Sequence, residues 1–146
     1  MKITDPPIVI EHHFQTSKEK LWHAITEQGQ MVQWFFDNIE AFEPVVGFKT
    51  HFVVKNEGRI FPHLWKITEV EPYKKITYNW KYEGYPGDSD LTFELIKQKN
   101  GTKLRLTHQI LESFPQNIPE FKRESCLGGW HYFIKQRLHD YLSNTK

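Results

Sequence analysis

The sequence predicts an α+β fold in which a curved antiparallel sheet of about six to seven strands wraps around one long C-terminal helix. Alternating apolar and polar residues mark a series of short strands through the middle of the chain. Two short helical patterns follow the first strand, and residues 119–143 carry apolar side chains at spacings of three and four. We expect the 146 residues to form a single domain, residues 1–146.

The N-terminal part of the chain predicts one strand followed by two short helices. Apolar and polar residues alternate from Pro7 to Phe14, as in a half-buried strand. Thr16 to Glu19 has the spacing of a capping box with Thr16 as the N-cap, which starts the first helix. A second short helix is expected around Met31, and a weak strand from Ile39 to Phe42.

The region from Phe48 to His108 predicts strands joined by tight turns. Asn56-Glu57-Gly58 and Asn100-Gly101 are hairpin signals, because Asn and Gly accept the positive φ angles of short turns. Regular alternation gives each strand one solvent-exposed face and one buried apolar face. The apolar face must pack against another element, and we expect this element to be the long helix.

The long helix is expected to begin near Pro119, since proline is tolerated in the first turn. Its apolar stripe consists of Leu127, Trp130, Phe133, Ile134, Leu138, Tyr141 and Leu142. Gly128 and Gly129 interrupt the helix, and each is about 1 kcal/mol less favourable there than alanine. Close approach of another element or a widened cavity mouth would explain the pair, and close packing is the favoured interpretation.

Composition excludes several functional classes. The net charge is +1 and the basic residues are scattered, so no nucleic-acid partner is expected. No apolar stretch approaches about 18 residues, so no membrane span is expected. The N-terminus lacks the features of a signal peptide and Cys126 is the only cysteine, which predicts a cytoplasmic protein without an internal disulfide. No long apolar edge strand stands out, so a monomer is expected.

The order of elements, together with several local motifs, resembles the START-like (SRPBCC) superfamily and its helix-grip fold. Within it, the chain is most similar to the family of the activator of the heat-shock-protein-ninety ATPase, in the form of its stand-alone bacterial relatives. The matching stretches are Lys20–Thr26, Gln33–Phe35, Gly47-Phe48, Ile67–Pro72, Ile76–Trp80, Asn100–His108 and Gly128–Trp130. The resemblance implies the fold, a cavity between the sheet and the long helix, and a cytoplasmic setting. It does not imply one function.

The inward-facing positions predict an aromatic cavity that binds a small apolar or aromatic molecule. Small-molecule pockets are mostly apolar and aromatic, with a few placed polar groups. Trp65 stands where relatives often carry a small residue, so it would shrink the cavity. The expected cavity residues are Phe48, Phe52, His63, Trp65, Tyr78, Trp80, Phe93, Leu106, His108, Trp130 and Ile134.

Two of these positions, His63 and His108, are polar. A buried imidazole without a partner costs roughly 1–3 kcal/mol, and Tyr78 and Tyr82 are candidate partners on the same face. The imidazoles could anchor the polar group of a ligand or act as a general acid or base. The alternative, favoured for His108, is a structural hydrogen bond that closes the sheet onto the helix.

Two other functions stay open. The resemblance alone suggests a co-chaperone-like protein that binds a chaperone ATPase through its surface and stimulates it. An enzyme is the third possibility, because START-like cavities in other families host cyclase or hydrolytic chemistry, and His108 with Tyr78 could form an acid–base pair. The sequence has no zinc motif, phosphate loop or nucleophile elbow, so we expect no catalytic residue, metal or cofactor.

Overall fold

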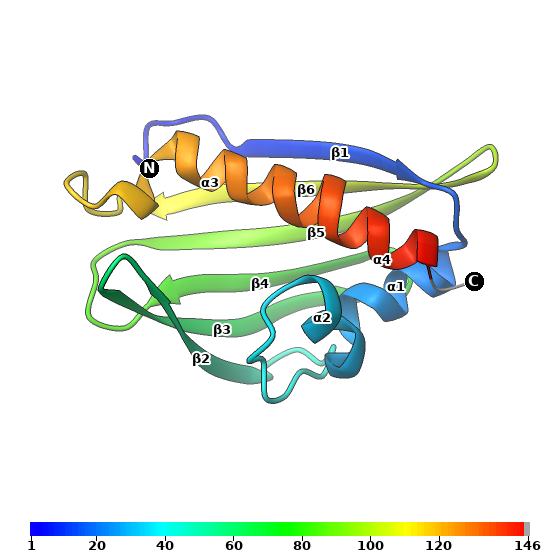
Figure 1. Ribbon diagram of the computed structural model, residues 1–146, viewed down its shortest axis with the longest axis horizontal. Helices are drawn as coiled ribbons and strands as arrows, with labels where there is room; N and C mark the ends of the chain where they lie inside the picture. The colour runs from blue at the N-terminus through cyan, green and yellow to red at the C-terminus, as the bar shows by residue number, and fades with distance from the viewer. Residues whose placement is uncertain (145–146) are drawn as a thin grey trace.

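The computed structural model describes residues 1–144 and contains a six-stranded antiparallel sheet with helices along its concave face (Figure 1). This confirms the predicted α+β helix-grip fold. In chain order the elements are β1 (Ile8–Phe14), α1 (Lys18–Thr26), α2 (Gln28–Trp34), β2 (Lys49–Asn56), β3 (Arg59–Glu71), β4 (Lys75–Tyr82), β5 (Asp88–Gln98), β6 (Gly101–Glu112), the 3-10 turn η1 (Pro119–Phe121), α3 (Arg123–Trp130), the π-helical η2 (His131–Leu138) and α4 (His139–Asn144).

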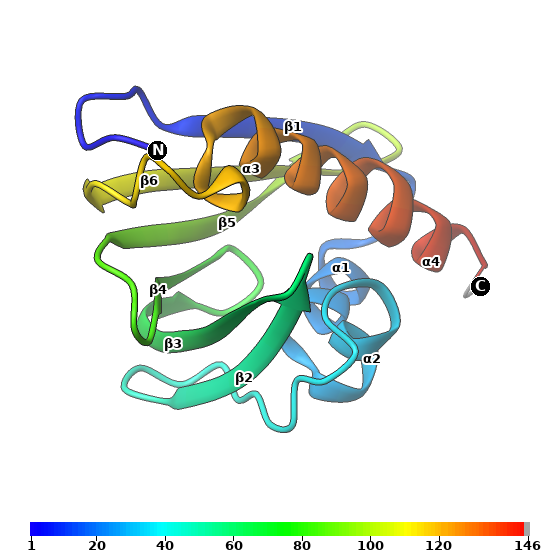
Figure 2. The same cartoon turned by 60° about the vertical axis from the view of Figure 1, so that its left-hand side comes forward.

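The strand order in the sheet is β1-β6-β5-β4-β3-β2, so the first strand pairs with the last. Ile8 lies opposite His108, and the register continues to Phe14 opposite Thr102. The sheet curves around the C-terminal helix, while α1 and α2 cover one end of it (Figure 2). The core therefore fills the space between the concave face and these helices, and the buried inward residues of β3, β4 and β6 alternate with more exposed ones as predicted.

The first helix begins one residue later than the capping box predicted. Ser17 is its N-cap, and the Ser17 hydroxyl oxygen accepts a hydrogen bond from the Lys20 backbone nitrogen at 3.1 Å. The predicted cap, Thr16, instead accepts a bond on its backbone carbonyl from the Thr102 hydroxyl at 2.9 Å. The start of α1 is thus tied to the start of β6, a long-range contact that the local spacing does not contain.

The strand predicted for Ile39–Phe42 was wrong. Ile39 and Phe42 are buried, but the segment is irregular and joins no sheet. A side chain satisfies its backbone in place of a neighbouring strand, because the Gln28 amide donates to the Ile39 carbonyl at 2.6 Å. The Phe42 ring packs edge-on against Trp65 and Tyr78, so the segment closes the core beside α2.

The C-terminal helix is confirmed, with 22 residues running from Arg123 to Asn144. It begins later than Pro119, because η1 is a separate turn and Lys122 is extended, with ψ of 146°. Its middle is π-helical from His131 to Leu138. Trp130, Ile134 and Leu138 are buried along the sheet.

The π-helical segment explains how a spacing of four residues keeps one face buried. Four residues exceed the 3.6-residue turn of an α-helix, so such a stripe drifts around an α-helix. A π turn closes i→i+5 hydrogen bonds and holds more residues than an α turn, which reverses the drift. The wider turns thus keep Ile134 and Leu138 pointing at the sheet along the whole helix.

A chain of hydrogen bonds joins the helix to three strands through His108. The Trp130 indole N–H donates to His108 Nδ1 at 3.3 Å, so Nδ1 is an acceptor and the ring proton sits on Nε2. His108 Nε2 donates to the Ser89 hydroxyl oxygen at 2.9 Å, and that hydroxyl donates to the Trp80 carbonyl at 2.7 Å. Both imidazole nitrogens are therefore bonded inside the protein. This agrees with the favoured interpretation of His108 as a structural hydrogen bond that closes the sheet onto the helix.

Tyr78 is not the partner of His108, so the acid–base pair suggested by the sequence was wrong. The Tyr78 hydroxyl is buried and has no hydrogen-bond partner among residues 1–144. Burial raises the pKa of Tyr78 well above its usual value, which keeps the phenol neutral.

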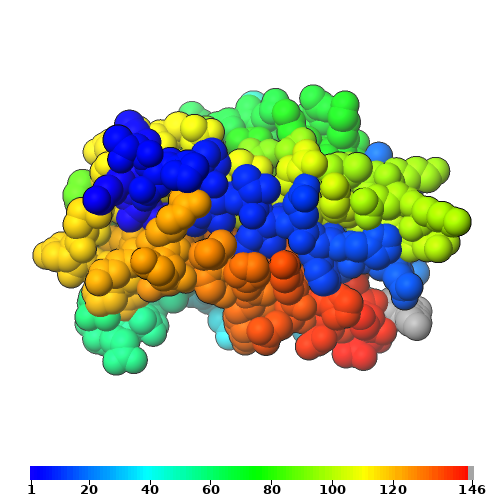
Figure 3. All heavy atoms as spheres, turned by 90° about the horizontal axis from the view of Figure 1, so that it is seen from above, coloured from blue at the N-terminus to red at the C-terminus, as the bar shows by residue number. Residues whose placement is uncertain are grey.

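The N-terminal residues lie beside the first turns of α3, as the space-filling view shows (Figure 3). The Met1 ammonium donates to the Phe121 carbonyl at 2.5 Å, and the Arg123 guanidinium donates to the Pro6 carbonyl at 2.6 Å. These contacts fix the point at which the helix begins. None of the helices within residues 1–144 is both long and apolar enough to cross a bilayer.

Replacing Ser89 with alanine should lower the free energy of unfolding by about 1–3 kcal/mol, because the buried His108 Nε2 proton loses its acceptor. Urea unfolding at pH 7 measures the change. Thr92→Val is the control: its hydroxyl pairs with Thr77 in a half-buried position that water can replace, so a change within about 0.5 kcal/mol is expected. Equal losses in both variants would argue against the His108 chain.

Acidification should destabilise the protein through His108. Burial lowers the pKa of His108 to about 4. Between pH 6.5 and 4 the unfolded chain takes up a proton that the folded protein does not, so stability is complete above pH 6.5 and falls as the pH drops toward 4. At pH 4.5 this loss is about 2–3 kcal/mol.

Urea midpoints of the wild type and of His108→Gln, measured at pH 7 and pH 4.5, test this. The Gln side chain does not titrate, so the variant should lose less stability on acidification than the wild type, and carboxylates that titrate in both proteins cancel in the comparison. An identical pH dependence in both proteins would contradict the assignment.

Candidate functional site

A pocket of about 410 Å³ lies between the sheet and the first half of the C-terminal helix. Its size falls within the roughly 300–1,000 Å³ of small-molecule sites. Strands β2, β3 and β4 form one wall, and α3 and the start of η2 form the other. The lining residues are Phe36, Val54, Lys55, Asn56, Phe61, His63, Trp80, Tyr82, Glu120, Cys126, Gly129, Trp130 and Phe133.

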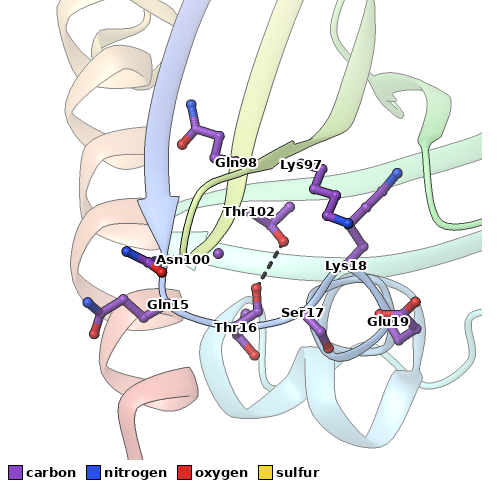
Figure 4. Close-up of a pocket in the computed structure, with 10 residues that line it drawn as sticks. Gln15, Thr16, Ser17, Lys18, Glu19, Lys97, Gln98, Asn100 and Thr102 are labelled. Atoms are coloured by element: carbon purple, nitrogen blue, oxygen red, sulfur yellow. Dashed lines mark hydrogen bonds between the residues drawn. The ribbon is translucent and has the colours of Figure 1, made fainter.

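A larger surface hollow, of about 520 Å³, lies where β1 meets α1 and the β5–β6 turn (Figure 4). Its labelled side chains are polar, and the one hydrogen bond drawn joins Thr102 to the Thr16 carbonyl. The Ser17 hydroxyl is already engaged as the cap of α1. The buried hydroxyl of this hollow, that of Thr102, is engaged by its bond to Thr16, and none of the lining side chains is aromatic, so the pocket under the helix is the better candidate site.

Aromatic rings from four elements wall the candidate pocket. The Trp80 ring packs edge-on against Trp130, with centroids 5.4 Å apart, and joins β4 to the helix. The ring of Phe36, which follows α2, packs edge-on against that of Phe133, with centroids 5.1 Å apart. Such edge-to-face pairs hold the rings in fixed orientations. The walls are therefore rigid enough to present a defined apolar surface.

The glycine pair in the helix marks the opening of this pocket. A Cβ atom added at Gly128 or Gly129 would meet nothing within 4 Å outside its own helix. The preference for close packing was therefore wrong, and the alternative of a widened cavity mouth fits. Gly129 lines the pocket whereas Gly128 is exposed and does not.

His63 places a hydrogen-bond acceptor in the pocket wall. Its Nδ1 lies 2.9 Å from the Phe61 carbonyl, and because a carbonyl can only accept, Nδ1 carries the proton. Nε2 then holds a lone pair, and it makes no hydrogen bond to any residue of the described chain. The ring stacks on Phe52 with centroids 4.8 Å apart and is 5% exposed. Burial lowers the pKa of His63 to about 4, so the imidazole is neutral at pH 7.

Cys126 brings a thiol to the pocket, but not a reactive one. Its sulfur lies 3.5 Å from His108 Nδ1, a neighbour that the sequence spacing did not reveal. Burial raises the pKa of Cys126 to about 12 and lowers that of His108 to about 4. Both groups are neutral near pH 7, whereas nucleophilic cysteines carry a lowered pKa. The pair does not form an activated nucleophile.

An ion pair joins two distant segments at the rim of the pocket. Arg59 binds Glu120 through two N–O contacts of 2.7 Å, and the Asn56 amide adds a third of 2.7 Å. The hydrogen bonds from Arg59 and Asn56 hold the pKa of Glu120 down, at about 2. The β2–β3 hairpin is thereby tied to η1, and the carboxylate presents little free charge to the pocket.

The pocket contains His63, Trp80 and Trp130 from the predicted cavity residues. The interior beneath α2 holds three other predicted residues, Phe52, Trp65 and Tyr78. There Trp65 stacks on Phe35 with ring centroids 5.6 Å apart and fills that half of the interior. The remaining predicted residues also lie outside the pocket: His108 sits behind Trp130, Phe48 is half-buried before β2, and Phe93, Leu106 and Ile134 are core residues.

Several lining residues were missed by the sequence reasoning. Phe61 continues the inward alternation of His63 by one step, and Tyr82 and Phe133 lie on stripes already recognised as apolar, so extending these patterns would have found them. Phe36 and Cys126 carry no such signal, because they reach the pocket only through the packing of α2 and α3. Within residues 1–144, no group of three or more His, Cys, Asp or Glu side chains is placed to hold a metal ion.

Solved structures share this architecture. Protein MLL2253 from Mesorhizobium loti is 25% identical, with a TM-score of 0.75 over 97% of this chain and 99% of that one. The structure described as the Aha1 dimer from Colwellia psychrerythraea is 22% identical, with a TM-score of 0.73 over 97% and 99%. DynU16, from the dynemicin biosynthetic locus, is 20% identical with a TM-score of 0.76, but the match covers only 49% of its length against 97% of this chain.

No curated protein matches the chain. The model of the family described as "Activator of Hsp90 ATPase homolog 1-like protein" matches residues 15–143, which run from just after β1 to the last turn of the C-terminal helix. This range includes the pocket, the helix and the strands that face it, so the chain belongs to the Activator of Hsp90 ATPase homolog 1-like family.

Proposed function

We propose that the pocket between the sheet and the C-terminal helix binds a small, largely apolar or aromatic molecule. One observation carries the proposal: an aromatic pocket opens at Gly129, a helical position where glycine is about 1 kcal/mol less favourable than alanine and where no neighbour requires the absence of a side chain. A void kept open at a cost to stability is typical of a site selected for its contents rather than for packing.

The character of the lining supports binding rather than catalysis. The walls are mainly rings, and the polar groups among them are uncharged at pH 7: the His63 imidazole, the Cys126 thiol, the Tyr82 hydroxyl and the indole N–H groups of Trp80 and Trp130. Glu120 is the acidic group at the rim, and Arg59 balances its charge. A molecule that loses its water shell here meets apolar surface and few competing charges, which favours an uncharged ligand.

The ligand occupies only part of the interior in this proposal. Trp65, Phe35 and Phe42 fill the half beneath α2, so the free volume is confined to the half beneath α3. A compact molecule of one or two rings suits such a space better than a long acyl chain does. We place this activity in the cytoplasm, and the monomeric state expected from the sequence stays a prediction.

A side chain at Gly129 should displace the ligand. Native mass spectrometry of protein purified gently from its own host should show a small molecule bound to the wild type and absent from Gly129→Leu. Gly128→Leu is the matched control: it removes the neighbouring glycine, gains similar helix propensity of up to about 1 kcal/mol, and points away from the pocket, so it should keep the ligand. A bare mass for all three proteins would contradict the proposal.

Family membership favours a second candidate function, the stimulation of a chaperone ATPase through the outer surface. A chaperone of the heat-shock-protein-ninety type from the same cell should then hydrolyse ATP faster in the presence of excess protein. Gly129→Leu should stimulate as well as the wild type, because its change is confined to the pocket. An unchanged rate with either protein would remove this candidate.

A further inference from the structure

The hydrogen-bonding state of the pocket narrows the chemistry of the ligand that it would hold. His63 is its best-defined polar group, since the ring packs against Phe52, Tyr82 and Trp80 with centroids 4.8, 4.7 and 5.4 Å away. With Nδ1 committed to the Phe61 carbonyl, only Nε2 can meet a ligand. The position of this nitrogen is fixed by the surrounding rings, so it is a preformed contact point.

A neutral imidazole with its proton on Nδ1 can only accept at Nε2. The ligand must therefore bring a hydrogen-bond donor to this point, or leave a polar nitrogen desolvated without a partner. A ligand carboxylate would place two further hydrogen-bond acceptors next to the lone pair of His63 Nε2, and the carboxylate and the lone pair would repel each other. Lys55 is the cation among the lining residues, and it belongs to the hairpin end of β2 at the rim rather than to the aromatic wall.

We propose that the ligand is an uncharged aromatic molecule with a hydroxyl group, which donates to His63 Nε2 while its rings lie among the aromatic walls. This inference rests on the proposed function, because it names the chemical class of ligand for the same pocket. Neutrality of the site at pH 7 agrees with it, since burial lowers the pKa of His63 and raises that of Cys126.

The Cys126 thiol does not compete for the same role. A thiol is a weak donor and a weak acceptor, and its sulfur lies 3.5 Å from His108 Nδ1, whose lone pair already accepts from the Trp130 indole. The Glu120 carboxylate could accept from a ligand hydroxyl, but it already receives three hydrogen bonds from Arg59 and Asn56. His63 Nε2 and the Tyr82 hydroxyl oxygen are then the acceptors of the aromatic wall without a bond among residues 1–144, and a variant that replaces only the imidazole tells them apart.

A matched set of probes on the wild-type protein tests the inference without relying on any variant. The first probe, 2-naphthol, carries a hydrogen-bond donor. Naphthalene is smaller than 2-naphthol and 2-methoxynaphthalene is larger, and neither carries a hydrogen-bond donor. The fourth probe, 2-naphthoate, is anionic. Equilibrium dialysis at pH 7 gives each dissociation constant. We expect 2-naphthol to bind about tenfold more tightly than the other three, which is the size of one neutral hydrogen bond. If apolar burial alone determined affinity, 2-naphthol would bind more weakly than naphthalene.

His63→Phe adds a second readout, because it keeps an aromatic ring and removes the acceptor. The variant should bind 2-naphthol about tenfold more weakly and naphthalene unchanged. His51→Phe makes the same replacement on the exposed outer face of β2 and should alter neither value. Circular dichroism of each variant confirms that it is folded.

The possible failures are distinguishable. If none of the four probes binds the wild type, both the ligand class and the proposed function are overturned. If the probes bind the wild type but 2-naphthol has no advantage, or keeps its advantage in His63→Phe, the pocket stands as a binding site and the hydroxyl inference falls. Tighter binding of 2-naphthoate than of 2-naphthol would also overturn it.

Discussion

The architecture depends on one buried polar contact, the bond from the Trp130 indole to His108. A curved sheet and a helix that meet only through apolar side chains can slide over one another, because dispersion contacts have little directionality. The His108 chain ends on Ser89 and the Trp80 carbonyl, so it fixes the helix to the middle of the sheet at one point. Each polar group in it has a partner, which is the condition under which a buried polar network stabilises a unique arrangement.

That fixed point divides the interior into two halves with different contents. On the side of α2, Trp65 packs against Phe35 and Phe42, and farther along the helix Ile134 and Leu138 are buried. On the side of α3, Gly129 lets the helix pass the sheet without filling the space between. The same helix therefore packs the core along one stretch and provides an accessible wall along the other.

The sequence predicted the inward faces of the strands well, because alternation is a local pattern that burial of one face enforces. It could not tell the two buried histidines apart. His108 is satisfied by Ser89 and Trp130, which are remote in the chain, whereas His63 bonds only to its own strand. The opening at Gly129 was equally hidden, because the absence of an opposing atom depends on the whole fold. Short-range patterns likewise misassigned Ile39–Phe42, since a strand needs a free edge to pair with as well as suitable residues.

The link between Arg59 and Glu120 joins residues 61 positions apart at the rim of the pocket, and both side chains are partly exposed. In the function we propose, the rings and the imidazole within the pocket set the affinity for a ligand, whereas this ion pair holds the rim in shape. An exposed ion pair is weakened by salt whereas buried apolar contacts are not, so a rise in ionic strength would loosen the rim before it weakened the contacts inside the pocket.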